Sequence, residues 1–330
     1  MSTIPITIAA GDYDRTRPIK DGRVPVDGCD VTYLTMEPEE LFFRAIRYEE
    51  FDVCELSLSS YIMQSSKGKT GYTAIPVFLS RAFRHSGFYI RTDRGIDGPA
   101  DLKGKLVGMP EYQMTACVWQ RGFLKDEHGI EATDIHWRSG GQETPGREER
   151  APITLPPEID LQRIPNDKTL AGMLADGELD ALMLPRAPSC FVNGAPNVGR
   201  LFPDYRTAEQ DYYRKSGLHP LMHMVAVKKS LVEKYPWLPA NLYKAFRLAK
   251  DLAVADLERI TALPLVLPWV GAELAATRAV LGEDFWPYGV QANEKELRAL
   301  MRYQIEQGLT DTEQPLENLF APTTFATAVV

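Results

Sequence analysis

Residues 73–91 read TAIPVFLSRAFRHSGFYIR, and the rest of the chain is best interpreted around them. The apolar runs Ala74–Leu79 and Phe88–Ile90 predict two buried strands. The polar residues between them include two arginines and a histidine, Arg81, Arg84 and His85. Guanidinium groups keep their charge, so they need anionic partners when buried. The segment therefore indicates either a cleft that binds an anion or a solvated surface turn.

A second segment of the same kind, residues 216–227, favours the cleft. It reads SGLHPLMHMVAV, polar and then apolar, and it carries His219 and His223. Two such strands, one leaving a lobe and one returning, predict a two-lobed α/β protein with its site near the crossings. We expect one lobe at 1–88 with 224–330, a second at 89–223, and a ligand cleft between them.

Composition limits the classes of function. A chain of 330 residues is long enough for two lobes, and 44% hydrophobic with 25% charged residues is typical of a soluble globular protein. The formal net charge of -8 argues against a nucleic-acid partner or an anionic membrane. No run approaches the ~18 apolar residues of a membrane span. The first residues lack the basic start of an export signal, so we expect a cytoplasmic protein.

Cysteine and histidine spacing does not indicate a metal site. The four cysteines lack CxxC spacing, which is typical of reduced thiols. His219 and His223 are four residues apart, as on one face of a helix, but Pro220 and the apolar run after it favour a strand. We expect neither a metal nor another cofactor.

Two turns of the first lobe follow predicted strands. After Ile4–Ala10 comes Gly11–Arg17, which holds Asp12 and Arg15; it is placed either to contact a ligand or, through Asp12 or Asp14, to cap a helix. After Phe51–Leu56 a helix opens at Ser57 and Ser59. Its hydroxyls and free N–H groups suit a carboxylate, and they suit a plain helix cap equally well.

The second lobe repeats this arrangement. The strand Lys105–Met109 leads to a turn and an amphipathic helix beginning near Met114. Residues 139–157, rich in Gly, Pro, Glu and Arg, predict a long loop that is either functional or disordered. The C-terminal part predicts amphipathic helices that serve as scaffold, at Pro236–Ala262, Trp269–Leu281 and Asn293–Gln307.

These clusters resemble the 4,5-dihydroxyphthalate decarboxylase family over essentially the whole chain and with matching spacing. The segments that carry the resemblance are Gly11–Thr16, Glu55–Tyr61, Arg81–Ser86, Pro110–Ala116, Arg200–Tyr205 and Trp286–Gly289. The resemblance implies a two-lobed type II periplasmic-binding-protein-like fold with two interlobe crossings. It also implies that one carboxylate is lost from 4,5-dihydroxyphthalate, or a close hydroxylated aromatic dicarboxylate, to give 3,4-dihydroxybenzoate and CO2. A solute-binding protein without chemistry is the alternative, because that function would use the same fold.

The roles of single residues follow from the chemistry of such a reaction. A general acid must protonate the ring, and His85 or His219 is favoured, with His223 third, although a lone histidine is often structural. Arg81 and Arg84 are candidates to hold carboxylates, with Arg15 and Arg17 in reserve. Glu55 and Asp12 are candidates to hold the phenols or to orient a histidine.

The remaining candidate ligand contacts come from the turn of the second lobe: Tyr112, Gln113 and Thr115. Tyr112 has core packing as its alternative role. The expected partner is a small aromatic dicarboxylate, and the exposed faces of the C-terminal helices are compatible with a homo-oligomer.

Overall fold

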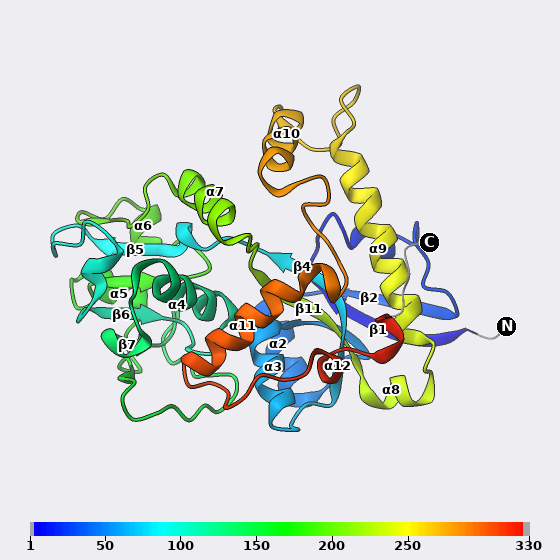
Figure 1. Cartoon of the computed structure of the whole chain (residues 1–330), viewed down its shortest axis with the longest axis horizontal. Helices are drawn as coiled ribbons and strands as arrows, with labels where there is room; N and C mark the ends of the chain where they lie inside the picture. The colour runs from blue at the N-terminus through cyan, green and yellow to red at the C-terminus, as the bar shows by residue number, and fades with distance from the viewer. Residues whose placement is uncertain (1–2, 326–330) are drawn as a thin grey trace. The chain divides into compact units, whose positions relative to one another are not determined.

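The computed structural model describes residues 3–325 of the chain (Figure 1). Their contacts divide the chain into two compact units. Unit 1 takes the described residues of Met1–Arg81, Leu221–Lys295 and Gln314–Val330, and unit 2 takes Ala82–Pro220 and Glu296–Glu313. The chain thus leaves unit 1 after Arg81, returns at Leu221, and enters unit 2 once more for residues 296–313.

Unit 1 is built on a five-stranded sheet of order β2-β1-β3-β11-β4. Its strands are β1 (Ile4–Ala10), β2 (Cys29–Thr35), β3 (Val53–Ser57), β4 (Tyr72–Arg81) and β11 (Leu221–Lys228). Strand β1 runs parallel to β2 and β3, whereas β11 is antiparallel to both of its neighbours, β3 and β4. The late strand β11 therefore inserts between two strands from the start of the chain.

The main helices of this unit carry apolar faces that are buried. In α2 (Pro38–Tyr48), Pro38 occupies the first turn, where its missing N–H costs nothing, and Leu41, Phe42 and Ala45 are buried. The long helix α9 (Leu238–Leu257) packs against β4. The other helical segments of unit 1 are α1 (Arg17–Lys20), α3 (Leu58–Ser66), α8 (Lys229–Lys234), α10 (Val270–Leu281), η4 (Gln291–Asn293), α12 (Leu316–Leu319) and η5 (Pro322–Thr324).

Unit 2 has a six-stranded sheet of order β10-β5-β9-β6-β7-β8. The strands are β5 (Phe88–Arg91), β6 (Leu106–Met109), β7 (His136–Ser139), β8 (Leu161–Arg163), β9 (Ala181–Met183) and β10 (Val198–Arg200). Strands β9, β6, β7 and β8 are mutually parallel, and β5 is antiparallel to β9 and β10. The helical segments before the last return are η1 (His85–Gly87), η2 (Pro99–Leu102), α4 (Thr115–His128), η3 (Ala132–Asp134), α5 (Leu170–Ala175), α6 (Ser189–Val192) and α7 (Tyr205–Ser216).

The helix α11 (Glu294–Glu306) lies almost wholly in unit 2, whereas the expected first lobe took all of 224–330. Side chains explain this placement, because the ring of Tyr303 packs edge-on against Trp119 of α4 at 5.4 Å. The Tyr303 hydroxyl donates to Asp126 at 2.6 Å, and Gln307 Nε2 donates to the Val118 carbonyl at 2.9 Å. Local sequence patterns do not predict such contacts between segments that are far apart in the chain.

The predicted α/β fold is confirmed. The two strands predicted within residues 73–91 are present as β4 and β5. Among residues 3–325, no helix is long and apolar enough to cross a membrane.

Candidate functional site

The register between β3 and β11 gathers the polar side chains of unit 1 on one face of its sheet. Val225 pairs with Glu55, and His223 pairs with Ser57. Directly opposed residues point to the same face of an antiparallel pair, and so do residues two apart on one strand. Glu55 and His223 are therefore diagonal neighbours.

The carboxylate of Glu55 is fully buried and accepts hydrogen bonds from three segments. Its Oε1 lies 2.7 Å from Nδ1 of His223 and accepts from the Tyr13 hydroxyl at 2.9 Å. Its Oε2 accepts from the backbone N–H of Gly11 at 3.0 Å. Burial acts to raise the pKa of Glu55, but the contact with His223 and the other two donors outweigh it, so its pKa lies below the usual range. Glu55 is thus an ionised carboxylate inside the unit.

The imidazole of His223 is held through its Nδ1 atom. Its side chain is 19% exposed, and its ring meets the ring of Phe42 edge-on at 4.8 Å. An ionised Glu55 accepts from Nδ1–H, which fixes the ring orientation and leaves Nε2 to exchange a proton. This is the geometry of an oriented acid or base.

The turn after β1 closes around Gly11. A Cβ there would lie 2.4 Å from the ring of Tyr13, so only glycine allows this approach. The Gly11 carbonyl accepts from the hydroxyls of Tyr33 at 3.1 Å and Thr16 at 3.2 Å. Burial, together with the charge of Glu55, raises the pKa of Tyr13, which keeps its hydroxyl protonated as a donor.

Asp12 and Asp14 do not cap a helix, because the N-cap of α1 is Thr16. Asp12 instead accepts from Arg17 Nε at 3.0 Å on the surface. Asp14 Oδ1 lies 3.1 Å from Nη1 of Arg15. The capping interpretation of these two carboxylates is therefore wrong.

Arg15 lies between two aromatic rings. Its guanidinium carbon is 4.3 Å from the Tyr13 ring centroid and 4.6 Å from that of Trp286. Its Nε donates to the Leu79 carbonyl at 2.7 Å, and the Trp286 indole donates to the Phe78 carbonyl at 2.9 Å. The group is rigid, 17% exposed, and close to Tyr13, which contacts Glu55.

Arg81 has a different environment. It is 5% exposed, and its Nη2 donates to the Pro287 carbonyl at 2.8 Å and to the side-chain oxygen of Asn293. Asn293 Nδ2 in turn donates to the Gly289 carbonyl at 2.7 Å. These contacts anchor the turn at residues 286–289, so Arg81 has the surroundings of a structural residue.

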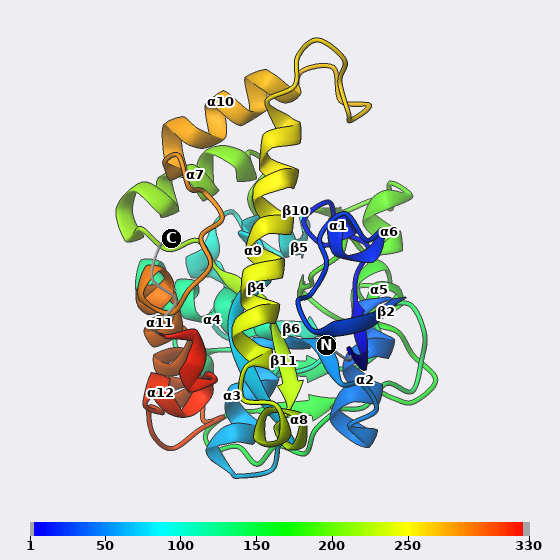
Figure 2. The same cartoon turned by 90° about the vertical axis from the view of Figure 1, so that its right-hand side faces the viewer.

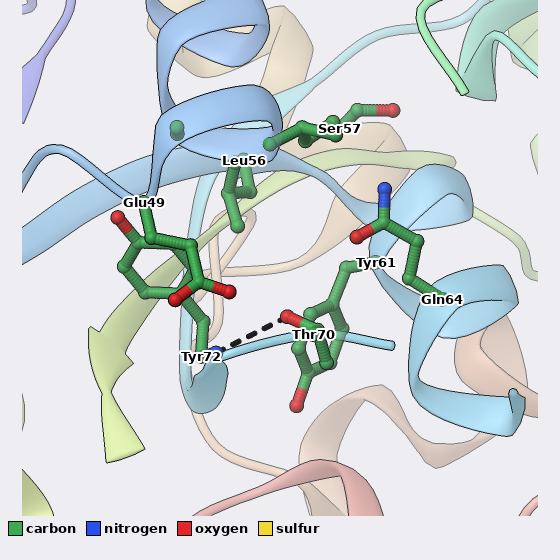
Figure 3. A pocket seen from close by; sticks show the side chains of 9 residues that line it. Glu49, Leu56, Ser57, Tyr61, Gln64, Thr70 and Tyr72 are labelled. Atoms are coloured by element: carbon green, nitrogen blue, oxygen red, sulfur yellow. Dashed lines mark hydrogen bonds between the residues drawn. The ribbon is translucent and has the colours of Figure 1, made fainter. Parts of the chain in front are cut away.

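Ser57 and Ser59 are buried at the start of α3. Ser57 is its N-cap residue but makes no side-chain capping bond, and Ser60 Oγ donates to Ser57 Oγ at 3.1 Å. Ser57 also lines a small pocket, drawn in Figure 3, together with Tyr61 and Tyr72. Its space for the centre of a water molecule is only about 10 Å³, enough for about one water. A benzene dicarboxylate does not fit there.

In unit 2, His85 belongs to an aromatic cluster. It is 2% exposed, stacks on Phe123 at 4.4 Å with an interplanar angle of 9°, and lies 5.2 Å from the Phe202 ring. Burial lowers the pKa of His85 to about 4, so it is neutral at physiological pH. His219 stacks on Phe83 at 4.8 Å. Arg84 is half-buried and its Nη1 donates to the Pro185 carbonyl at 3.3 Å.

The turn after β6 is packed inward. The Tyr112 hydroxyl donates to the Gln307 carbonyl at 3.1 Å, and the Arg121 guanidinium lies 3.7 Å above the Tyr112 ring. Gln113 is fully buried, and its Nε2 donates to the Ala151 carbonyl at 2.8 Å. Thr115, the first residue of α4, is 1% exposed.

A buried carboxylate also holds the long loop of residues 140–160. Glu111, 1% exposed, accepts from Arg150 Nε at 2.7 Å and from Arg147 Nε at 3.0 Å. Burial acts to raise the pKa of Glu111, but the two guanidinium groups outweigh it and lower the pKa. Glu149, from the same loop, accepts from the Tyr112 N–H at 2.5 Å. The loop is thus ordered by ion pairs.

None of the four cysteines forms a disulfide. Burial raises the pKa of Cys117 to about 12 and also raises the pKa of Cys54. Within residues 3–325, no group of three or more His, Cys, Asp or Glu side chains is arranged to hold a metal ion.

Comparison with known proteins places the chain in a family. It is 45% identical to 4,5-dihydroxyphthalate decarboxylase from Comamonas testosteroni over 322 residues, which is 98% of both chains. The protein of the same name from Pseudomonas putida is 51% identical over 214 residues, covering 65% of this chain and 83% of that one. The chain belongs to the 4,5-dihydroxyphthalate decarboxylase family. No protein-family profile matches it.

Solved structures show the fold of this family member. A putative periplasmic sulfonate-binding protein SsuA from Methylobacillus flagellatus matches with a TM-score of 0.55 and 14% identity, over 99% of this chain and 94% of its own. The aliphatic sulphonate-binding protein SsuA from Escherichia coli gives a TM-score of 0.54 and 12% identity, over 98% and 99%. A variant of the desulfurization enzyme DSZB, bound to biphenyl-2-sulfinic acid, gives 0.52 and 15%, over 97% of each chain. The fold is the type II periplasmic-binding-protein-like fold.

Within this decarboxylase family member, the structure brings together Glu55, His223 and the turn at Gly11–Arg15. Tyr13 and Trp286, which frame Arg15, carried no predicted role. A signal for the pair existed in the sequence, because Glu55 and His223 each interrupt an apolar strand. A titratable residue inside a buried strand needs a partner, although the sequence does not say which one.

Glu149 gives the stability of this protein a testable pH dependence. Burial, and then the charge of Glu111, raises the pKa of Glu149 to about 7 from 4.5. The pKa of such an acid is higher in the folded protein than in the unfolded chain. The free energy of unfolding therefore falls as the pH rises from the unfolded-state pKa through the folded-state pKa. From about pH 5 to about pH 8, we expect the wild type to lose on the order of 1–2 kcal/mol of unfolding free energy that Glu149→Gln retains.

Urea unfolding at several pH values measures this difference. The control is Glu148→Gln, because the Glu148 side chain is 75% exposed and pairs with Arg163 on the surface. It should follow the wild-type dependence. Equal pH dependence in the wild type and in Glu149→Gln would contradict the assignment.

Proposed function

We propose that this chain decarboxylates 4,5-dihydroxyphthalate to 3,4-dihydroxybenzoate and CO2, as a carboxy-lyase. The observation that carries the proposal is the 45% identity over 98% of the chain to a protein of that name. The oriented acid–base pair of unit 1 supports chemistry rather than binding alone. The four free cysteines support a cytoplasmic location for the reaction.

The reaction needs a proton before it loses CO2. Direct loss of CO2 would leave a carbanion in the plane of the ring, where the π system cannot delocalise it. Each carboxylate-bearing carbon of the substrate instead has a hydroxyl para to it. Ionisation of that hydroxyl pushes electrons into the ring, the carboxylate-bearing carbon takes a proton, and CO2 leaves as aromaticity returns. The balance is one proton in and one CO2 out.

We assign the proton donor to His223. Its Nδ1 is held by an ionised, fully buried Glu55, so its Nε2 is the atom available to deliver the proton. Glu55 acts as a positioning residue, because it fixes the ring and offsets the imidazolium charge. This assignment differs from the expectation that favoured His85 or His219. His85, with its pKa near 4, is largely unprotonated at neutral pH.

We assign one substrate carboxylate to Arg15. Its guanidinium is preoriented between Tyr13 and Trp286, Nε and Nη2 both donate to the Leu79 carbonyl, and Nη1 contacts the half-exposed Asp14. A planar, fixed guanidinium suits bidentate recognition of a carboxylate. Arg81 is less suited to this role, because it is only 5% exposed and its Nη2 is shared between two acceptors, Pro287 and Asn293.

The direct test is incubation of the purified protein with 4,5-dihydroxyphthalate. We expect stoichiometric CO2 and 3,4-dihydroxybenzoate, followed by ring absorbance and by chromatography. Other hydroxylated benzene dicarboxylates serve as competitors in the same assay. Tight binding of the substrate without product would instead establish a solute-binding protein of the same fold.

Replacing His223 by Asn should lower kcat about 10²- to 10⁴-fold, because the general acid is lost. Glu55→Gln should lower kcat and also move the pH at which kcat changes, a shift that simple loss of packing would not produce. The matched control is His136→Asn, since His136 Nδ1 also contacts a carboxylate, Asp160, at 2.8 Å but is 53% exposed. An unchanged kcat in folded His223→Asn would reject the assignment.

Replacing Arg15 by Lys should raise KM about 10- to 100-fold, because a charged hydrogen bond contributes ~1.5–3 kcal/mol and lysine lacks the planar fork. Steady-state kinetics at fixed pH measures the change. Arg17→Lys is the control, because Arg17 is 51% exposed and pairs with Asp12 on the surface. A KM in Arg15→Lys equal to that of the control would remove Arg15 from the binding site.

A further inference from the structure

The segment that follows α9 is an exposed apolar arm, which we define as residues 258–281. It consists of a loop and the helix α10, and it extends past the C-terminal end of α9 within unit 1 (Figures 1 and 2). From Ile260 to Ala272 it reads ITALPLVLPWVGA, thirteen residues without a charge. Pro264 and Pro268 restrict the loop backbone, so the arm loses little freedom on binding.

The arm presents large side chains to solvent. Val266 is 108% exposed, Ile260 78% and Trp269 73%, and Leu263, Leu265 and Leu267 are each more than a third exposed. At roughly 150–250 Å² for a large apolar side chain, these six expose on the order of 600 Å². Contiguous apolar patches of this size on soluble proteins mark interaction sites.

Helix α10 adds a flat outer face to the arm. It buries only Val270 and Leu274 against its own unit. Its exposed residues include Gly271, Ala272, Ala275 and Ala279. Small side chains at this helical spacing let a second helix approach closely. A Cβ built on Gly271 would meet nothing within 4 Å, so the space above this face is open.

The charges around the arm disfavour a membrane as the partner. Within the arm, Arg259 pairs with Asp256 at 3.4 Å, and Arg278 pairs with Glu258 and with Glu283. Membrane-surface segments pair an apolar face with basic residues that meet anionic headgroups. Here both arginines of the arm are engaged by carboxylates, and the whole chain carries a net charge of -8.

We infer that the arm joins two copies of this chain. In a two-fold interface the same surface meets itself, and the uncharged run from Ile260 to Ala272 can do so without like charges in opposition. Two arms together would bury about 1,200 Å², the lower limit of a standard stable interface. This inference is independent of the decarboxylase assignment, because no arm residue belongs to the Glu55–His223 site.

The test is the mass of the full chain in solution, measured by sedimentation equilibrium over a range of concentrations. We expect an even-numbered assembly for the wild type, and for Val266→Asp a dissociation constant at least 100-fold higher, or an assembly of half the size. The matched control is Val192→Asp on α6, since Val192 is 68% exposed on unit 2. It should leave the assembly unchanged.

A cross-link locates the contact separately. Ala275→Cys, on the outer face of α10, should form an interchain disulfide under mild oxidation, whereas Val192→Cys should not. A monomeric wild type at all concentrations would overturn the inference. So would a Val266→Asp protein, shown to be folded by circular dichroism, that assembles as the wild type does.

Discussion

The architecture of unit 1 depends on one buried charge. A carboxylate without exposed surface costs several kcal/mol in desolvation unless donors surround it. Glu55 meets this requirement with the N–H of Gly11, the hydroxyl of Tyr13 and the imidazole of His223. Two of these groups come from the turn after β1, and the third comes from β11, the strand of this sheet that is latest in the sequence. The contact that orients the proposed proton donor therefore also joins distant parts of the chain.

Local patterns predict the elements of this fold well, because apolar runs and proline positions act over a few residues. Strands β4, β5 and β11 and the buried face of α2 follow from such patterns. The tertiary partners of single side chains do not follow from these local patterns. His85 and His223 stand in similar apolar surroundings along the chain, but the first packs among aromatic rings and the second meets a carboxylate. The difference lies in strand register and helix packing, which no single segment encodes.

The likeness to sulfonate-binding proteins extends to the fold alone, at 12–14% identity. A fold of this kind supplies strand ends and helix starts that many ligands can use, and the chemistry comes from the side chains placed there. In this chain those side chains include an ionised carboxylate beneath a histidine and an arginine fixed between two rings.

The return of α11 to unit 2 has a consequence for synthesis. Arg121 Nε donates to the side chain of Gln307 at 2.8 Å, and Trp119 packs on Tyr303, so the face of α4 stays uncovered until these late residues exist. A ribosome makes nearly all of unit 1 before it reaches them. Unit 2 begins at Ala82, but the packing on its helix α4 is completed only when residues 303–307 have been made, so the folding of unit 2 during synthesis finishes after most of unit 1 exists.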